Sequence, residues 1–205
     1  MITPTAVARV YAGQTIACLG SGPSLCRADV ELLVAADVRI IAINDAYTIA
    51  PEAAVLYAAD EHWWRWHKGA PSFLGQRVGI EPQRIAWAGL QVLRNTGRDG
   101  LELAPDGLRT GGSAGTSGYQ AINLAVHLGA ARVLLLGYDL QGRHFFGEHP
   151  NKTVPDFHAA RLAFEMLVSP LAALGVSVIN CSRATTLTTF RRAALADALG
   201  ATVSR

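Results

Sequence analysis

Short hydrophobic runs alternate along most of this chain with segments whose apolar residues have helical spacing. The runs are rich in β-branched residues and end at glycine or a polar residue, which predicts buried parallel strands. They lie at 15–19, 39–43, 54–59, 132–136 and 176–180. Helical spacing predicts helices over 25–36, 113–128, 157–174 and 188–199. Alternating strands and helices indicate a mostly parallel sheet with helices on both faces.

The pattern weakens between residues 61 and 112. A Trp- and His-rich stretch at 60–68 is followed by scattered Gly and Pro, and one further strand is expected at 84–87. Irregular segments inside a regular fold are typical of lids or insertions. We therefore expect a single Rossmann-like α/β domain over 1–205, in which 61–112 form a reduced lid or an insertion.

Composition narrows the classes of function. The 205 residues suit one α/β domain, half of them are hydrophobic, and the net charge is only +2. The basic runs are short, as at Arg191-Arg192, so nucleic acid is not indicated as a partner. The odd number of cysteines predicts reduced thiols rather than a disulfide framework.

The sequence predicts neither a membrane span nor a signal peptide. No apolar run approaches the roughly 18 residues of a membrane span, and residues 1–13 lack the basic and apolar segments of a signal peptide. We therefore expect a cytoplasmic protein with small-molecule partners, and a homo-oligomer is compatible with the sequence.

A glycine turn follows the first strand. The motif G-S-G-P-S runs from Gly20 through Ser21 to Ser24. Gly20 and Gly22 allow a tight turn, Pro23 suits a first helical position, and Ser24 adds a hydroxyl beside the helix N-terminus. Backbone N–H groups at such a turn predict an anion site for a nucleotide phosphate. The motif lacks the third glycine of a dinucleotide fingerprint and the G-K-[ST] of a P-loop, and a turn without ligand is the alternative.

Further polar residues follow other strands, and the carboxyl ends of parallel strands share one edge of the sheet. Asn44 and Asp45 are candidates for a base or ribose, and Tyr138 for the same crevice. Asp60 and Asp139 could hold Mg²⁺ against phosphates, if the protein is metal-dependent. The alternative for the aspartates is helix or turn capping.

The densest run of small residues, 111–118, precedes a helix. Ser113, Thr116 and Ser117 offer hydroxyls to a ligand there, and Gly118 allows close approach of the backbone. Close packing of the helix on the sheet is the alternative.

Tryptophan and histidine side chains form two further groups of candidate functional residues. Trp63 and Trp66 could stack on a sugar or base, or pack a lid onto the core. Among the histidines after the 132–136 strand, His144, His149 and His158, any one could be a general base or a solvated loop residue.

Taken in order, several motifs resemble the bacterial CMP-sialic-acid-dependent sialyltransferases. They are G-S-G-P-S-L at 20–25, Asn44, T-S-G at 116–118, L-G-Y-D at 136–139 and V-I-N-C-S at 178–182. They also resemble a related group that holds archaeal 6-hydroxymethylpterin pyrophosphokinases and motility-associated proteins implicated in flagellin glycosylation, in which a G-G-S stretch like 111–113 recurs.

The resemblance implies that the glycine turn, Asn44 and residues 116–118 bind the nucleotide. It also implies that His149, in the G-E-H-P-N segment at 147–151, is the catalytic base. The family's tyrosines before that histidine have no counterpart here, where Phe145 and Phe146 stand.

The expected function is a transferase that uses a nucleotide or nucleotide-sugar donor and an acceptor. Glycosyl transfer comes first, and Mg²⁺-dependent pyrophosphoryl transfer from ATP or a non-catalytic nucleotide-binding module are the alternatives. Whether the protein is an enzyme is therefore left open by the sequence.

Overall fold

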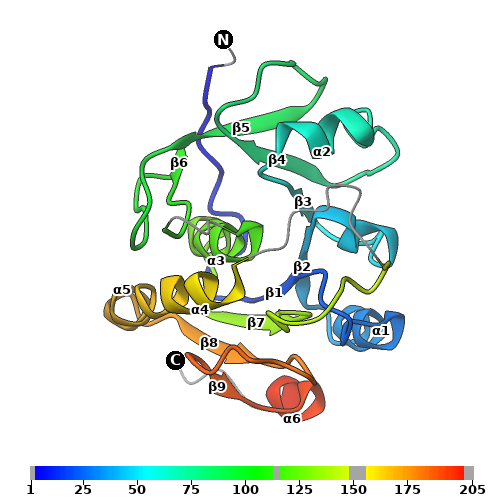
Figure 1. Ribbon diagram of the computed structural model, residues 1–205, viewed down its shortest axis with the longest axis vertical. Coiled ribbons are helices and arrows are strands. Elements are labelled where there is room, and N and C mark those ends of the chain that lie inside the picture. Colours follow the sequence, from blue (N-terminus) through cyan, green and yellow to red (C-terminus); the bar gives the residue numbers. More distant parts are fainter. Residues whose placement is uncertain (1–2, 113–115, 148–155, 201–205) are drawn as a thin grey trace.

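Parallel strands form one sheet in the computed structural model, which describes residues 3–112, 116–147 and 156–200 (Figure 1). The nine strands found in these ranges are β1 (Thr15–Leu19), β2 (Arg39–Ile43), β3 (Val55–Tyr57), β4 (Gln76–Ile80), β5 (Leu90–Asn95), β6 (Gly107–Leu108), β7 (Arg132–Leu136), β8 (Ser177–Asn180) and β9 (Arg191–Arg192). Their order in space is β6-β5-β4-β3-β2-β1-β7-β8-β9. The expected Rossmann-like α/β fold is confirmed.

The helices cover both faces of this sheet. They are α1 (Arg27–Ala35), the 3₁₀ helix η1 (Asn44–Thr48), α2 (Glu61–Trp66), α3 (Ser117–Leu128), α4 (Phe157–Glu165), α5 (Val168–Ala173) and α6 (Leu195–Gly200). Helices α3, α4 and α5 share one hydrophobic core with the sheet, and α1, α2 and α6 share the other. The two-sided covering explains why the central strands are continuous hydrophobic runs.

Strand β1 lies where the direction of the winding reverses. From β1 the chain builds outward to β6, and α3 then carries it back to β7 on the opposite side of β1. Leu19 at the end of β1 pairs with Ala42 of β2 and with Leu136 of β7. The carboxyl ends of these three strands therefore meet at the switch point, where open α/β sheets bind ligands.

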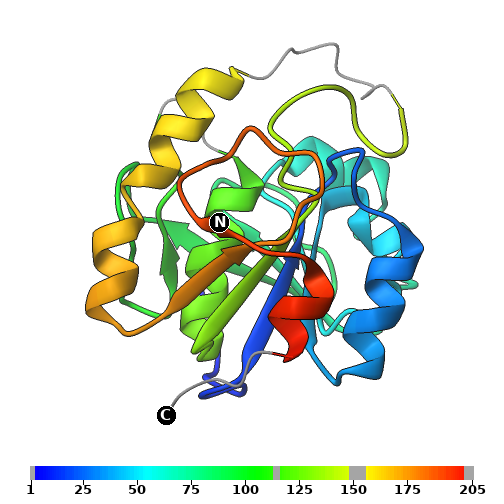
Figure 2. The ribbon, with the colours of Figure 1, turned by 90° about the horizontal axis from the view of Figure 1, so that it is seen from below.

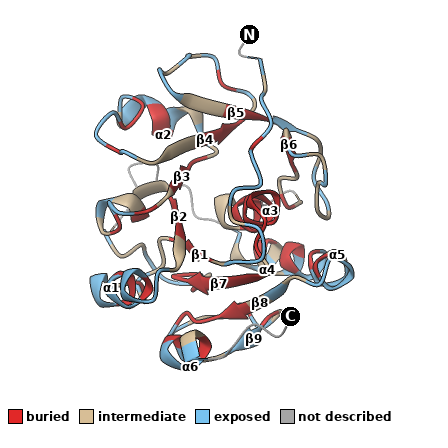
Figure 3. Ribbon diagram, turned by 180° about the vertical axis from the view of Figure 1, so that it is seen from behind, coloured by how far each residue is buried: buried red, intermediate tan, exposed pale blue. Residues whose placement is uncertain are grey.

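Helix α3 is the most deeply buried helix of the described structure (Figure 3). Every residue from Tyr119 to Leu128 is buried, as expected of a helix that is hydrophobic on most sides. Its outer side is covered by the N-terminal segment around Val7 and by the loop near Leu101. Gly129 ends it in the left-handed conformation, so the helix stop predicted there is confirmed.

One expectation for 61–112 is corrected by the structure. Residues 84–87 form no strand; β4 and β5 lie on either side of them. The segment supplies α2 and three strands that extend the sheet, and its role as a lid or an insertion stays a prediction. Strand β5 is half-exposed and carries Gln91 and Arg94, so it lacks the hydrophobic run that marks a central strand.

Two predicted helices are also shorter than expected. The 157–174 segment is divided into α4 and α5, because Pro170 has no backbone N–H and cannot continue a long helix. In the 188–199 segment only α6 is helical among the described residues, since Arg191 and Arg192 pair with β8 instead.

Candidate functional site

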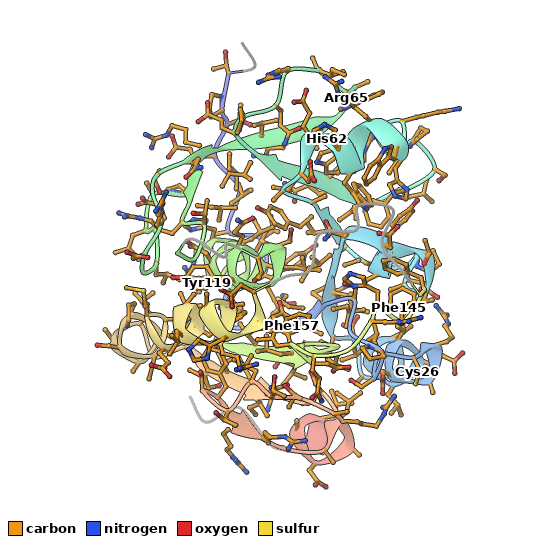
Figure 4. All side chains as sticks on the ribbon, viewed as in Figure 1. Cys26, His62, Arg65, Tyr119, Phe145 and Phe157 are labelled. Carbon is orange, nitrogen blue, oxygen red and sulfur yellow. The ribbon has the colours of Figure 1, made fainter. Side chains whose placement is uncertain are left out.

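A pocket of about 180 Å³ opens at the carboxyl ends of β1, β2 and β7. Its described lining consists of residues 20–22, 43–44, 116–118, 137–138 and 140–144, with Phe157 and Phe164 from α4. Figure 2 shows that the segment after β7, in yellow-green, lies at the same end of the sheet as the turn after β1. Phe157, labelled in Figure 4, stands at the first residue of α4. The predicted convergence of strand ends at one crevice is thus seen for three of the strands.

The glycine turn is docked on the end of β7. The N–H of Gly20 donates to the carbonyl of Leu136 at 2.8 Å, and that of Gly22 donates to the carbonyl of Gly137 at 2.9 Å. A Cβ atom on Gly20 or on Gly22 would lie 2.6 Å from the Gly137 oxygen. Both glycines therefore permit close backbone packing between neighbouring strand ends, which is the structural alternative for this motif.

Asp139 takes the hydrogen bonds that the glycine motif offers to an anion. Its carboxylate accepts from the Ser24 N–H at 2.7 Å and from the Ser24 hydroxyl at 2.5 Å. Asp139 is 1% exposed, and neither it nor Ser24 lines the pocket. The turn at Ser24 is thus satisfied from within the protein, and the anion expected there is a carboxylate of the chain.

Helix α1 also begins later than expected. Cys26 is its N-cap, so Pro23 lies three residues before that cap and the prediction of Pro23 at a first helical position is wrong. The physical reason is that Leu25 closes the turn by donating its N–H to the Gly22 carbonyl.

The first turn of α3 forms one wall of the pocket. Thr116 caps the helix by accepting from the Tyr119 N–H, and Ser117 and Gly118 follow it in the lining. The first N–H groups of a helix have no partner within the helix and carry a partial positive charge. Pocket residues 116–118 are therefore the helix terminus best placed to receive an anion.

Tyr138, two residues after the end of β7, supports that wall. Its hydroxyl donates to the Gly118 carbonyl at 3.0 Å, and a Cβ on Gly118 would lie 2.9 Å from the Tyr138 ring. Burial raises the pKa of the Tyr138 hydroxyl well above its ordinary value. The hydroxyl thus stays protonated as a donor, and its role here is to support the wall.

Asn44 lies in the pocket, as predicted, and Asp45 does not. Asn44 has the left-handed φ of +50°, and its side-chain Oδ1 is buried with no hydrogen-bond partner among the described residues. Asp45 turns instead toward α2, where its carboxylate accepts from the Trp63 indole at 3.1 Å and lies 3.2 Å from the His67 Nε2 atom. Trp63 is accordingly a core residue, 2% exposed.

The loop after β7 closes over the glycine turn through Ser21. The Phe145 N–H donates to the Ser21 carbonyl at 2.9 Å, and the Ser21 hydroxyl is 2.8 Å from His144 Nδ1. The His144 ring stacks on Phe146 at 4.9 Å between centroids. His144 and its neighbour Arg143 both line the pocket.

The other candidates are either outside the described residues or away from the pocket lining. His149 and Ser113 are outside the described residues, and His158 is exposed and not part of the lining. Asp60 caps α2 by accepting from the His62 N–H at 2.7 Å, and it does not line the pocket. Within the described ranges, no group of three or more His, Cys, Asp or Glu side chains is placed to hold a metal ion.

Arg143 is a charged pocket residue that the sequence analysis did not single out, and His144 is a histidine that it ranked below His149. The available signal was position in the chain, because residues 140–144 come soon after β7 and β7 borders the switch point.

In the part of the chain that the structure describes, no helix has the length and apolar character needed to cross a membrane. Comparison with protein-family models, curated proteins and solved structures finds no match to this chain.

Proposed function

We propose that the protein is a transferase that binds a nucleotide-activated donor in this pocket, with glycosyl transfer from a nucleotide sugar as the reaction. The observation that carries the proposal is the convergence of three complementary groups. A helix terminus at 116–118, Arg143, and Asn44, whose buried Oδ1 has no partner among the described residues, all border one space at the switch point.

The charges in the pocket suit a phosphate. The positive end of the α3 dipole and the Arg143 guanidinium favour an anion, and a guanidinium can bind phosphate oxygens in a bidentate manner. A buried acceptor without a partner costs free energy until a ligand supplies a donor. Asn44 Oδ1 would therefore accept from a ribose hydroxyl or from an amino group of a base.

The size of the pocket favours one end of a mononucleotide. Its described walls enclose about 180 Å³, less than the ~300–1,000 Å³ of sites for drug-sized ligands. A phosphate with its ribose suits such a space better than a dinucleotide does.

His144 is the candidate base that the geometry supports. When Nδ1–H donates to the Ser21 hydroxyl, Nε2 is the basic nitrogen of the ring and can take a proton from an acceptor hydroxyl. The α3 terminus would meanwhile stabilise the departing phosphate. His149 stays a second prediction for the same role.

The engaged carboxylate of Asp139 favours a reaction that does not depend on metal. Binding Mg²⁺ would compete with the two hydrogen bonds from Ser24 that hold the glycine turn. Mg²⁺-dependent transfer from ATP is therefore the second outcome that the experiment distinguishes.

The test begins with thermal unfolding in the presence of CMP, UDP, GDP, ATP and CMP-sialic acid, each with Mg²⁺ and with EDTA. A ligand at 100 times its Kd stabilises the folded state by about 2.7 kcal/mol, which raises Tm by roughly 5–10 °C in a chain of this size. We expect a pyrimidine nucleotide to do so in EDTA. Stabilisation by ATP with Mg²⁺ alone would favour pyrophosphoryl transfer, and no shift with any nucleotide would refute the proposed pocket.

The second part compares three histidine variants in turnover of the stabilising nucleotide sugar. His144→Ala should lower kcat by about 10²–10⁴-fold with donor affinity nearly unchanged, the usual loss for a general base. His158→Ala is the control, because His158 is exposed and outside the pocket lining. If His149→Ala alone lowers kcat, the base is His149. If wild type binds the donor but transfers nothing, the protein is a non-catalytic nucleotide-binding module.

A further inference from the structure

Outside the pocket lining, a cluster of polar and aromatic side chains joins η1 to α2. It consists of Asp45 and Tyr47 from η1, Trp63 from α2 and His67 from the cap of α2. None of the four lines the pocket. Asn44, by contrast, lines the pocket. It is the first residue of η1 and immediately precedes Asp45 in the chain.

Each polar group of the cluster has a partner within it. The Asp45 carboxylate accepts from Trp63 Nε1–H at 3.1 Å through Oδ2, and its Oδ1 lies 3.2 Å from His67 Nε2. The other ring nitrogen of His67 is 3.0 Å from the Tyr47 hydroxyl. A neutral imidazole satisfies both contacts when Nε2–H donates to Asp45 and Nδ1 accepts from Tyr47.

Aromatic packing fixes the same rings. His67 stacks on Trp63 with ring centroids 4.1 Å apart, and Tyr47 meets each of the two rings edge-on, at 5.8 Å from Trp63 and 5.6 Å from His67. Trp63 itself is buried in the core under α2. The partners of Asp45 are therefore held in place independently of any ligand.

Asn44 needs such support because its backbone is in a conformation that L-residues seldom adopt. Its φ of +50° lies in the left-handed region, which asparagine tolerates better than most residues but does not prefer. Its buried Oδ1 has no partner among the described residues that would hold the side chain. The orientation of Asn44 thus depends on the position of the adjoining peptide of Asp45.

We propose that Asp45, His67 and Trp63 form a clamp that holds Asn44 in its ligand-accepting orientation. Because the clamp would act on ligand binding, this proposal rests on the proposed function of the pocket. Asp45, expected from the sequence to contact the nucleotide, is on this proposal a positioning residue. The alternative is that the clamp only fastens α2 to the sheet.

The test uses a matched pair of substitutions at His67. In His67→Gln the amide nitrogen can occupy the position of Nε2 and keep the bond to Asp45, whereas the shorter side chain of His67→Asn cannot reach it. Asp45→Asn changes the other partner of that bond, because it replaces one of the two acceptor oxygens of the Asp45 carboxylate with an NH₂ group. His62→Gln on α2 is the outside control, because the His62 side chain is 69% exposed and contacts Asp60.

Calorimetry with CMP as the probe reads the effect on binding. We expect His67→Asn and Asp45→Asn to raise Kd about tenfold, as for a lost hydrogen bond to the ligand. His67→Gln and His62→Gln should bind like wild type. In an Asn44→Ala background, which itself weakens binding, Asp45→Asn should have no further effect. An equal effect of Asp45→Asn in both backgrounds would overturn the clamp.

A ligand-free measurement separates the clamp from the proposed function. The Asn44 side-chain amide signals in ¹H–¹⁵N NMR spectra should move in Asp45→Asn and His67→Asn and stay in place in His67→Gln. If wild type binds no CMP, the proposed function fails for that nucleotide and the NMR result alone decides the clamp. Unchanged Asn44 signals in Asp45→Asn would refute the clamp. If His67→Asn does not fold, the Asp45→Asn spectrum alone decides the question.

Discussion

Asp139 determines what the glycine turn does. From its motif the turn resembles an anion site, yet the Ser24 N–H and hydroxyl both donate to the Asp139 carboxylate, 115 residues away in the chain. The part of the motif that faces the pocket is its first half, since residues 20–22 line it. The turn therefore shapes the pocket and carries Ser21, and the first turn of α3 is the part of the wall whose N–H groups suit an anion.

Gly22→Ala tests this interpretation. The new Cβ would lie 2.6 Å from the Asp139 Cγ and from the Gly137 carbonyl oxygen, so the turn and β7 must move apart. We expect a loss of about 1–3 kcal/mol in the free energy of unfolding, the usual cost of overpacking. Urea denaturation measures this loss, with Gly200→Ala as the control because no atom of the described residues lies within 4 Å of a Cβ there. Equal stability of the two variants would contradict the tight docking of the turn.

Helix α3 joins the core to the pocket. Its buried length is packed between the sheet and the N-terminal segment, while its first residues, Ser117 and Gly118, border the ligand space. A rigid helix whose terminus is held by the Thr116 cap and by Tyr138 keeps its N–H groups in place before a ligand arrives. Such preorganisation lowers the cost of binding.

Thr116→Ala should affect both stability and binding. Loss of the bond from the Tyr119 N–H at 3.2 Å removes the cap, which we expect to cost about 0.5–2 kcal/mol of stability. Affinity for the nucleotide found by thermal shift should fall as well, because the first turn frays. Thr116→Ser keeps the hydroxyl and should restore both. If Ser and Ala behave alike, the hydroxyl is not the cap.

The whole molecule is held by cores on both faces of the sheet, and His127 lies buried in one of them. His127 Nε2 is 2.8 Å from the Gly107 carbonyl, so it links α3 to β6, and the residue is 6% exposed. Burial lowers the pKa of His127 from its ordinary value of 6.5. The unfolded chain therefore binds this proton more readily than the folded protein does.

The sign of the pH effect follows from that difference. The contribution of neutral His127 to stability is present above pH 6.5 and is lost as pH falls through the lowered folded-state pKa. Urea denaturation at pH 7.5 and pH 5 should give a smaller acid-induced loss for His127→Gln, whose amide can still donate to Gly107. His62→Gln, at an exposed site, should keep the loss of wild type. Equal losses in all three proteins would rule out His127 as the source.

The sequence by itself determined the central strands, the stop of α3 at Gly129, and the edge of the sheet at which Asn44 lies. These features follow from local patterns. Hydrophobic runs predict buried strands, and a glycine after a helical segment predicts a C-cap. They hold because each depends on residues close together in the chain.

Only the tertiary structure decided which polar groups face the pocket. The pairing of Ser24 with Asp139, the turn of Asp45 toward His67, and the approach of His144 to Ser21 each join segments that are far apart in sequence. Strands β4 and β5 were hidden for a related reason, since their partly exposed positions carry polar side chains, and β6 is only two residues long. A polar residue at a strand end is satisfied by whichever partner the fold brings to it, and no local pattern records that partner.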